Sequence, residues 1–438
     1  MTKFTGGDAG DLADAGTGVL SGFAGGTVAQ LQDLNDDRVF GGAGGDRVST
    51  GGGNDRVFGG TGDDALEGGD GSDALYGGTG NDTLTVQGDG LTGQLFGGAG
   101  ADVMTGSDHN DIFEGGRGID SLYGGTNVDV FRFLNGDDID FIDAGGGLLD
   151  GIDTLELSFV TLRCAVVDLE AGVWQMTGGP QQTILNMEHV SGTQMDDIFT
   201  GTASQEFLLG LGGADVLYGR GGIDQLDGGE DRDRLYGQTG SDKLFGGSDR
   251  DLLRAGAGND LLVGGTGNDR MIGSAGNDNV IGGDGHDLLR AGRGHDLLHG
   301  NSGLDTLLGA AGSDVLDGGS GADSLRGGAG ADQFLFTNDH DGVVNVDRIA
   351  DFEQGKDLMR FLGPGSGSAF GVLGATVDAG EVVNGAAALD GDDYLIYDAG
   401  SHTLYLDSDG SGAASQRAFA VLEGGPATLT AADFLMLV

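Results

Sequence analysis

The chain has 438 residues, of which 95 are glycine and only 3 are proline, and its formal net charge is −49. This composition lies outside ordinary globular usage, and the few prolines exclude collagen. The excess of carboxylates disfavours nucleic acid and anionic membrane surfaces as partners and favours cations. A disordered acidic tract is the alternative against which an ordered structure has to be argued.

Residues 1–34 precede the first repeats and form a separate N-terminal segment. The stretch MTKFTGGDAGDLADAG has one lysine and no apolar core, so we expect no amino-terminal secretory signal. No window of the chain approaches 18 apolar residues, so no membrane span is predicted. The single cysteine, Cys164, excludes an intramolecular disulfide, and its apolar surroundings indicate a small buried hydrophobic residue.

Residues 35–132 form a first array in which an acidic residue recurs every nine positions. A two-residue slip at Val86–Gln87 interrupts the register, and the nonad that follows has Gly93 in the acidic place. The aspartates in register are Asp37, Asp46, Asp55, Asp64, Asp73, Asp82, Asp102, Asp111, Asp120 and Asp129.

Residues 133–191 do not follow the repeat, and residues 192–335 then form a second array of 16 nonads without insertion or deletion. Glu206 holds one acidic place, and an apolar residue follows each acid two positions later. The aspartates in register are Asp197, Asp215, Asp224, Asp233, Asp242, Asp251, Asp260, Asp269, Asp278, Asp287, Asp296, Asp305, Asp314, Asp323 and Asp332.

The repeat unit is G-G-x-G-x-D-x-U-x, where U is apolar. Its glycine-rich half permits the positive φ values of a tight turn, and x-U-x predicts a short strand with its middle side chain facing inward. Two nonads then make one coil of 18 residues, and successive coils stack in parallel at about 4.8 Å.

Stacking brings like charges together, since two carboxylates about 5 Å apart repel by roughly 1 kcal/mol even in water. Calcium takes six to eight oxygen ligands, and a glycine-rich turn that ends in aspartate supplies both carbonyl and carboxylate oxygens. We therefore predict multiple bound Ca²⁺ ions, with the 25 aspartates named above as ligands.

This nonapeptide resembles the calcium-binding repeat of the RTX (repeats-in-toxin, hemolysin-type) proteins, from about Asn35 to the C-terminus. The resemblance implies an all-β fold, a parallel β-roll in two arrays joined by a wider non-repeat coil, with a C-terminal β cap. In the wider coil, Glu188 would stand at the acidic position. Residues 336–438 resemble the cap and secretion region of serralysin-like members, and the ending LTAADFLMLV resembles a type I secretion signal. A strand that closes the roll is the structural alternative for that ending.

Catalytic motifs are absent from the sequence: there is no HExxH and no G-x-S-x-G, so we expect no enzyme. The outward places of x-U-x are more informative. One sheet of the second array would show arginine beside apolar residues, as at Arg234 and Tyr236 or Leu252 and Arg254. The other would show Phe245, Leu261, Val263, Ile281, Leu297 and Val315. Such ladders either stabilise cross-strand pairs or mark contact surfaces.

The sequence thus predicts a secreted protein that folds on calcium outside the cell and acts as a structural or adhesive component, in a surface layer, biofilm matrix or self-assembling filament. Its expected partners are calcium, the type I secretion machinery, and either another copy or an acidic extracellular polysaccharide. Two alternatives stay open: a secreted polysaccharide-acting enzyme with its site in 133–191 or on a sheet face, and a secretion and folding module for a cargo.

Overall fold

The computed structural model describes residues 36–87, 92–134, 137, 140–145, 153–160, 165–177, 181–336, 346–362, 377, 381–385, 387, 394–407 and 416–437, and the backbone of four short strands before residue 34. These residues are almost wholly β, with one 3-10 turn, η2 (Ala431–Asp433). They belong to two compact units, 1–216 and 217–438. Cys164, for which we expected a buried position, lies outside the described residues.

Each nonad forms one strand whose side chains alternate between core and surface. In β28 (Leu252–Ala257), Leu253 and Ala255 are buried while Arg254 is exposed. The strand is longer than the three residues of x-U-x, because the glycine-rich residues after it also lie in register with the next coil, as Gly256 does with Ser274. The inward apolar series is confirmed, since its members in 208–334 are at most 1% exposed.

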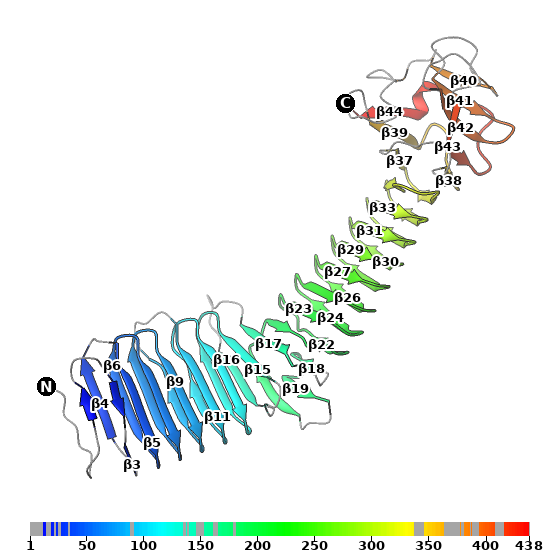
Figure 1. Ribbon diagram of the computed structural model, residues 1–438. Coiled ribbons are helices and arrows are strands. Elements are labelled where there is room, and N and C mark those ends of the chain that lie inside the picture. Colours follow the sequence, from blue (N-terminus) through cyan, green and yellow to red (C-terminus); the bar gives the residue numbers. More distant parts are fainter. Residues whose placement is uncertain are drawn as a thin grey trace. The chain divides into compact units, whose positions relative to one another are not determined.

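The first unit is a two-sheet parallel solenoid, in which strands alternate between the sheets (Figure 1). One sheet runs through β5, β7, β9, β11, β13 and β15, and the other through β4, β6, β8, β10, β12, β14 and β16. The strands are β1 (Leu12–Asp14), β2 (Val19–Ser21), β3 (Phe23–Ala24), β4 (Val28–Asp33), β5 (Arg38–Ala43), β6 (Arg47–Gly52), β7 (Arg56–Thr61), β8 (Ala65–Asp70), β9 (Ala74–Thr79), β10 (Thr83–Thr85), β11 (Gln94–Ala99), β12 (Val103–Thr105), β13 (Ile112–Arg117), β14 (Ser121–Gly125), β15 (Val130–Leu134) and β16 (Phe141–Gly145).

The non-repeat segment continues this solenoid and adds an antiparallel excursion. β17 pairs in parallel with β15 and β21, whereas β19 pairs antiparallel with both β18 and β20. Trp174 of β19 is buried, and its indole N–H donates to the Asp140 carbonyl oxygen at 2.9 Å. Its strands are β17 (Thr154–Phe159), β18 (Ala165–Asp168), β19 (Val173–Met176), β20 (Gln182–Leu185) and β21 (His189–Ser191), and the second array then begins with β22 (Ile198–Thr200) and β23 (Phe207–Leu211).

The second unit is likewise a parallel solenoid, whose rungs Figure 1 shows in green and yellow. Partners lie 18 residues apart: Leu244 is in register with Leu262, and Leu262 with Val280. Two nonads therefore make one coil, as predicted. The strands are β24 (Val216–Gly221), β25 (Gln225–Gly229), β26 (Arg234–Thr239), β27 (Lys243–Ser248), β28, β29 (Leu261–Thr266), β30 (Arg270–Ala275), β31 (Asn279–Gly285), β32 (Leu288–Arg293), β33 (Leu297–Gly303), β34 (Thr306–Ala311), β35 (Val315–Asp317), β36 (Ser324–Ala329) and β37 (Gln333–Phe336).

A β cap follows the last coil of the second unit. It consists of β38 (Asp347–Ile349), β39 (Leu358–Leu362), β40 (Val382–Asn384), β41 (Leu395–Asp398), β42 (Thr403–Asp407), β43 (Gln416–Leu422) and β44 (Phe434–Leu437). β44 pairs in parallel with β39, and the Phe434 ring stacks on Phe361 with the centroids 5.9 Å apart. The apolar ending thus forms a strand that extends the sheet, and its role as a secretion signal stays a prediction.

Candidate calcium-binding turns

The 25 predicted aspartates are all described, and all are buried at the ends of their turns. They form stacks along the roll, because the Asp242 backbone N–H donates to Asp260 Oδ1 at 2.8 Å and the Asp260 N–H donates to Asp278 Oδ1 at 3.0 Å. The same bond links acids one coil apart in both arrays. One carboxylate oxygen of each stacked acid is therefore committed to the backbone.

The second oxygen, Oδ2, is buried and accepts no hydrogen bond within the described part of the chain at most of these aspartates. A buried carboxylate oxygen left in this way costs several kilocalories per mole unless a cation or a proton satisfies it. This holds for Asp64, Asp73, Asp82, Asp102, Asp242, Asp251, Asp260, Asp269, Asp278, Asp287, Asp296, Asp305, Asp314, Asp323 and Asp332.

These oxygens face a small space that a carbonyl of the next coil also enters. A methyl group built on Gly246 would lie 2.5 Å from Asp251 Oδ2 and 2.6 Å from the Gly264 carbonyl oxygen. At Gly264 the corresponding distances are 2.4 Å to Asp269 Oδ2 and 2.5 Å to the carbonyl oxygen of Gly282. Glycine holds this first place of the nonad in most turns, and at Gly246 and Gly264 carboxylate and carbonyl oxygens from successive coils converge there. The small residues Thr50, Ala255 and Ala291 hold it in three others.

The pKa values of the stacked aspartates indicate that these buried carboxylates need a positive charge beside them. Burial raises the pKa of Asp251 from 3.8 to about 8, assisted by the carboxylates of Asp269 and Asp233 and opposed by the Asp233 backbone N–H. Burial likewise raises the pKa of Asp278 and of Asp323 to about 7. Without a cation, burial in the roll therefore disfavours the charged form of these carboxylates.

The turns keep one backbone shape even where the sequence disfavours it. The second place of the nonad has positive φ in most turns, and six residues other than glycine adopt it, among them Leu211 at 80° and Ala310 at 84°. Such a conformation costs an L-residue roughly 1–2 kcal/mol. The others are Arg220, Gln238, Ser274 and Asn301.

Three turns differ, because a hydroxyl residue in the second place satisfies the acid. The Ser107 backbone N–H and Oγ donate to Asp111 Oδ2 at 2.6 and 3.0 Å, and the Thr193 N–H donates to Asp197 Oδ2 at 2.7 Å. Thr202 does the same for Glu206, from its N–H at 3.1 Å. Asp111 and Asp197 remain predicted ligands, but they lack the open oxygen of the other turns.

The stacks also contain four aspartates that the nine-residue spacing did not predict. The Asp120 N–H donates to Asp140 Oδ1 and the Asp129 N–H to Asp153 Oδ1, at 2.9 and 2.7 Å. In the cap, Asp347 and Asp357 accept in the same way from Asp323 and Asp332. Each precedes a buried apolar residue by two positions, so the D-x-U pattern marks them where the nine-residue spacing does not. Glu188 also lies in the stack as expected, because its Oε2 accepts from the Asp153 N–H at 3.1 Å.

Within the described residues, no three His, Cys, Asp or Glu side chains gather closely enough to hold a metal ion by themselves. Carbonyl oxygens of the glycine-rich turns lie beside the carboxylates, as the Gly264 carbonyl does beside Asp251. An all-oxygen set of this kind suits a hard cation that accepts irregular geometry, which is the preference of Ca²⁺. The residues present thus fit calcium.

The fold and these turns define the class of molecule, a parallel β-roll built on calcium-binding turns. The family described as RTX calcium-binding nonapeptide repeat (4 copies) matches residues 33–66, 49–84, 87–122, 105–140, 191–226, 227–262, 263–298 and 299–334, more than half of the chain. The chain belongs to this family, whose repeats bind calcium, and its many repeats imply multiple Ca²⁺ ions.

Comparison with curated proteins gives no match. Among solved structures, the chain is similar to the AlgE6R3 subunit of the mannuronan C5-epimerase from Azotobacter vinelandii, known from a solution structure. The two are 27% identical over 36% of this chain and 77% of the other, with a TM-score of 0.19.

Proposed function

We propose that this protein folds on calcium outside the cell and serves there as a structural or adhesive component. RTX repeats indicate a secreted, extracellular calcium-binding protein in general. The buried Oδ2 atoms without a donor support folding on calcium, because at neutral pH a roll that buries so many half-satisfied carboxylates needs bound cations to be stable. Extracellular calcium modules bind at about 10⁻⁴–10⁻³ M, so the chain folds where calcium is abundant.

The outward sheet faces support the proposed structural or adhesive role. In the first unit, Phe40, Phe58, Tyr76 and Phe96 form a ladder of stacked rings with centroids 4.7–4.8 Å apart. In the second, Phe245, Val263 and Ile281 are in register and only partly buried. Repeated ladders on regular, rigid sheets suit lateral contact with another surface more than they suit a catalytic cleft. No helix of the described residues is long and apolar enough to cross a membrane.

Assembly and retention test this function. We expect the purified protein in millimolar calcium to form larger particles by light scattering or to stay bound to an extracellular matrix, and to release on chelation. Incubation with uronic-acid polymers, followed by analysis for cleavage or epimerisation, covers the enzyme alternative. A stable calcium-loaded monomer that adheres to nothing, or turnover of such a polymer, contradicts the proposal.

A further inference from the structure

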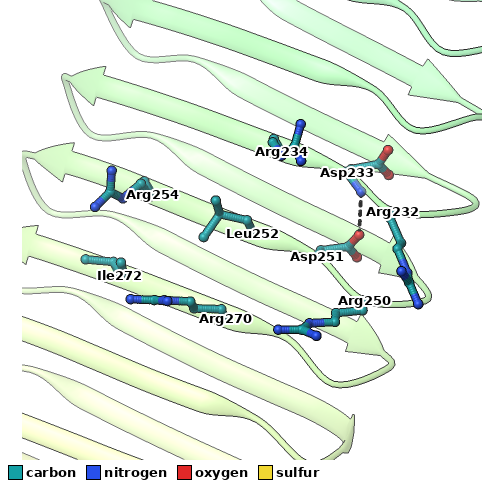
Figure 2. Close-up of a pocket in the computed structure, with 9 residues that line it drawn as sticks. All are labelled: Arg232, Asp233, Arg234, Arg250, Asp251, Leu252, Arg254, Arg270 and Ile272. Atoms are coloured by element: carbon teal, nitrogen blue, oxygen red, sulfur yellow. Dashed lines mark hydrogen bonds between the residues drawn. The ribbon is translucent and has the colours of Figure 1, made fainter.

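Five arginines gather on one face of the second unit, although the chain as a whole has a net charge of −49. They are Arg232, Arg234, Arg250, Arg254 and Arg270, and they line a groove of about 480 Å³ together with Leu252 and Ile272. We call this the arginine groove. Figure 2 shows Leu252 between the arginine side chains of successive rungs.

None of the five guanidinium groups forms a hydrogen bond or ion pair within the described residues, and all five are exposed. Arginines elsewhere in the chain do find carboxylates, as Arg326 does with Asp351 at 3.3 Å and Arg132 with Glu156 at 2.9 Å. The neighbouring Asp233 and Asp251 are buried and bonded to each other, from the Asp233 N–H to Asp251 Oδ1 at 2.8 Å. Arg250 acts electrostatically on the buried Asp269 and opposes the rise of its pKa. The three arginines of the sheet face, Arg234, Arg254 and Arg270, keep their positive charge available to a ligand.

The arginines alternate with tyrosine and apolar residues, both along each outward column of side chains and between the two columns. In one outward column Leu252 stands in register between Arg234 and Arg270, and in the other Arg254 stands between Tyr236 and Ile272. This arrangement keeps like charges from lying directly opposite each other across the strands. It also produces a zigzag row of guanidinium groups, Arg234, Arg254 and Arg270, one for each rise of about 4.8 Å along the roll.

We propose that the arginine groove binds a linear, carboxylated polysaccharide that runs along the roll, across the strands. This inference rests on the proposed extracellular role and names the partner of that surface. A guanidinium group binds a carboxylate through two parallel hydrogen bonds, and a polyuronate offers one carboxylate on each sugar. Leu252 and Ile272 supply apolar contact for the C–H faces of the sugar rings between the charges.

A second copy of the chain fits this groove less well. The opposite sheet of the second unit presents Phe245, Val263 and Ile281 in register, which gives no row of carboxylates to match the arginines. The stacked aspartates are buried in their turns. The exposed Asp231 and Asp249 directly precede Arg232 and Arg250, so we assign binding to the three arginines of the sheet face. Carboxylates farther away than the Debye length of about 8 Å oppose a polyanion only weakly at physiological ionic strength.

The test measures binding of short oligogalacturonates to the full chain in millimolar calcium by isothermal titration calorimetry. The triple variant Arg234→Gln, Arg254→Gln, Arg270→Gln should weaken binding roughly tenfold, since exposed charge pairs contribute modestly one by one. The matched control, Arg47→Gln, Arg117→Gln, Lys243→Gln, removes three exposed charges outside the groove and should bind like the unmodified protein. Neutral dextran should not bind, and added salt should weaken the oligogalacturonate complex.

Equal affinity of the triple variant and the unmodified protein overturns the proposal, and so does an equal loss in the matched control. A calcium-dependent dimer that the triple variant abolishes, seen by sedimentation without any sugar, assigns the groove to a second copy instead. Circular dichroism of the same samples reports calcium-driven folding separately. Failure of sugar binding with folding and assembly intact therefore rejects the groove assignment and leaves the proposed function standing.

Discussion

At the scale of single residues, the φ angle at the second place of the nonad differs between turns, and so do the hydrogen bonds to the buried carboxylate. The second place of the nonad has positive φ in most turns, and six residues other than glycine adopt it there. Ser274 shows this clearly, with φ of 91° between Gly256 and Gly292 in the adjacent coils. Ser107 occupies the same place of its nonad, but its N–H and hydroxyl bind Asp111 instead.

Ala310 gives a direct test of this cost. Its φ is 84°, so we expect Ala310→Gly to stabilise the calcium-loaded protein by about 1 kcal/mol, because glycine adopts positive φ without strain. The matched control is its exposed neighbour, where Ala311→Gly should destabilise by roughly 0.5–1 kcal/mol through lost chain stiffness. Urea unfolding in saturating calcium measures both. Equal effects of the two substitutions contradict the turn argument.

At the scale of the element, each coil is held by two kinds of contact that respond differently to conditions. The inward residues, such as Leu253, Leu262 and Met271, form a fully buried apolar column. The turn edges contain buried carboxylates whose pKa values are raised, so their contribution depends on whether a proton or a cation satisfies the open oxygen. Each coil adds only a few apolar side chains to this column, so its stability also depends on the proton or cation that satisfies the carboxylates in its turns.

This dependence predicts an unusual pH response in the absence of calcium. The pKa values of Asp260 and Asp269 rise from 3.8 to about 6, and that of Asp251 to about 8. A raised pKa in the folded state means that the metal-free roll binds protons that the unfolded chain has released. This stabilisation is complete below pH 3.8 and is lost as the pH rises through 6 to 8.

We therefore expect the strand signal in circular dichroism to grow as a calcium-free sample is acidified from pH 8 to pH 5. In the presence of calcium, protons compete with the ion, so the calcium affinity should fall below about pH 6. A calcium-free signal that stays constant or grows with rising pH contradicts the assignment of the turns.

At the scale of the whole molecule, charge decides between an expanded and a folded chain. A net charge of −49 on 438 residues favours expansion, and bound calcium offsets it at the turn edges. The chain contains two compact units, 1–216 and 217–438, and each contains stacked turns of this kind. The five-part division that we expected, with breaks near residues 34, 132, 191 and 335, stays a proposal.

Sedimentation and small-angle scattering check this scale. An unfolded chain of this length has a radius of gyration of roughly 75 Å, and we expect a value near this in excess chelator at neutral pH. Calcium should lower it cooperatively, and chelator should restore it. Magnesium at the same concentration should act weakly, because it demands a stricter octahedral geometry. A compact chain in chelator at neutral pH contradicts the charge argument.

Much of the fold followed from the sequence. The nine-residue register predicted two strands per coil, the inward apolar series and the buried aspartates. Every nonad has the same turn and strand pattern, and stacking such units buries their apolar residues in one continuous core. Counting by nine failed where the spacing changed, so Asp140, Asp153, Asp347 and Asp357 were missed although their D-x-U pattern is intact.

By itself, the sequence of residues 255–283 determines a coil period, a buried column and carboxylates one coil apart, since these depend on spacing alone. Only the tertiary structure decided which carboxylate oxygens stay open. Ser107 and Ser274 are the same residue in the same place of the nonad, yet one closes its turn and the other leaves Asp278 Oδ2 without a donor. The backbone of the turn makes the difference, because Ser274 has a φ of 91° whereas Ser107 points its N–H and hydroxyl at Asp111. Stacking likewise brought Arg234, Arg254 and Arg270 into one groove from separate coils.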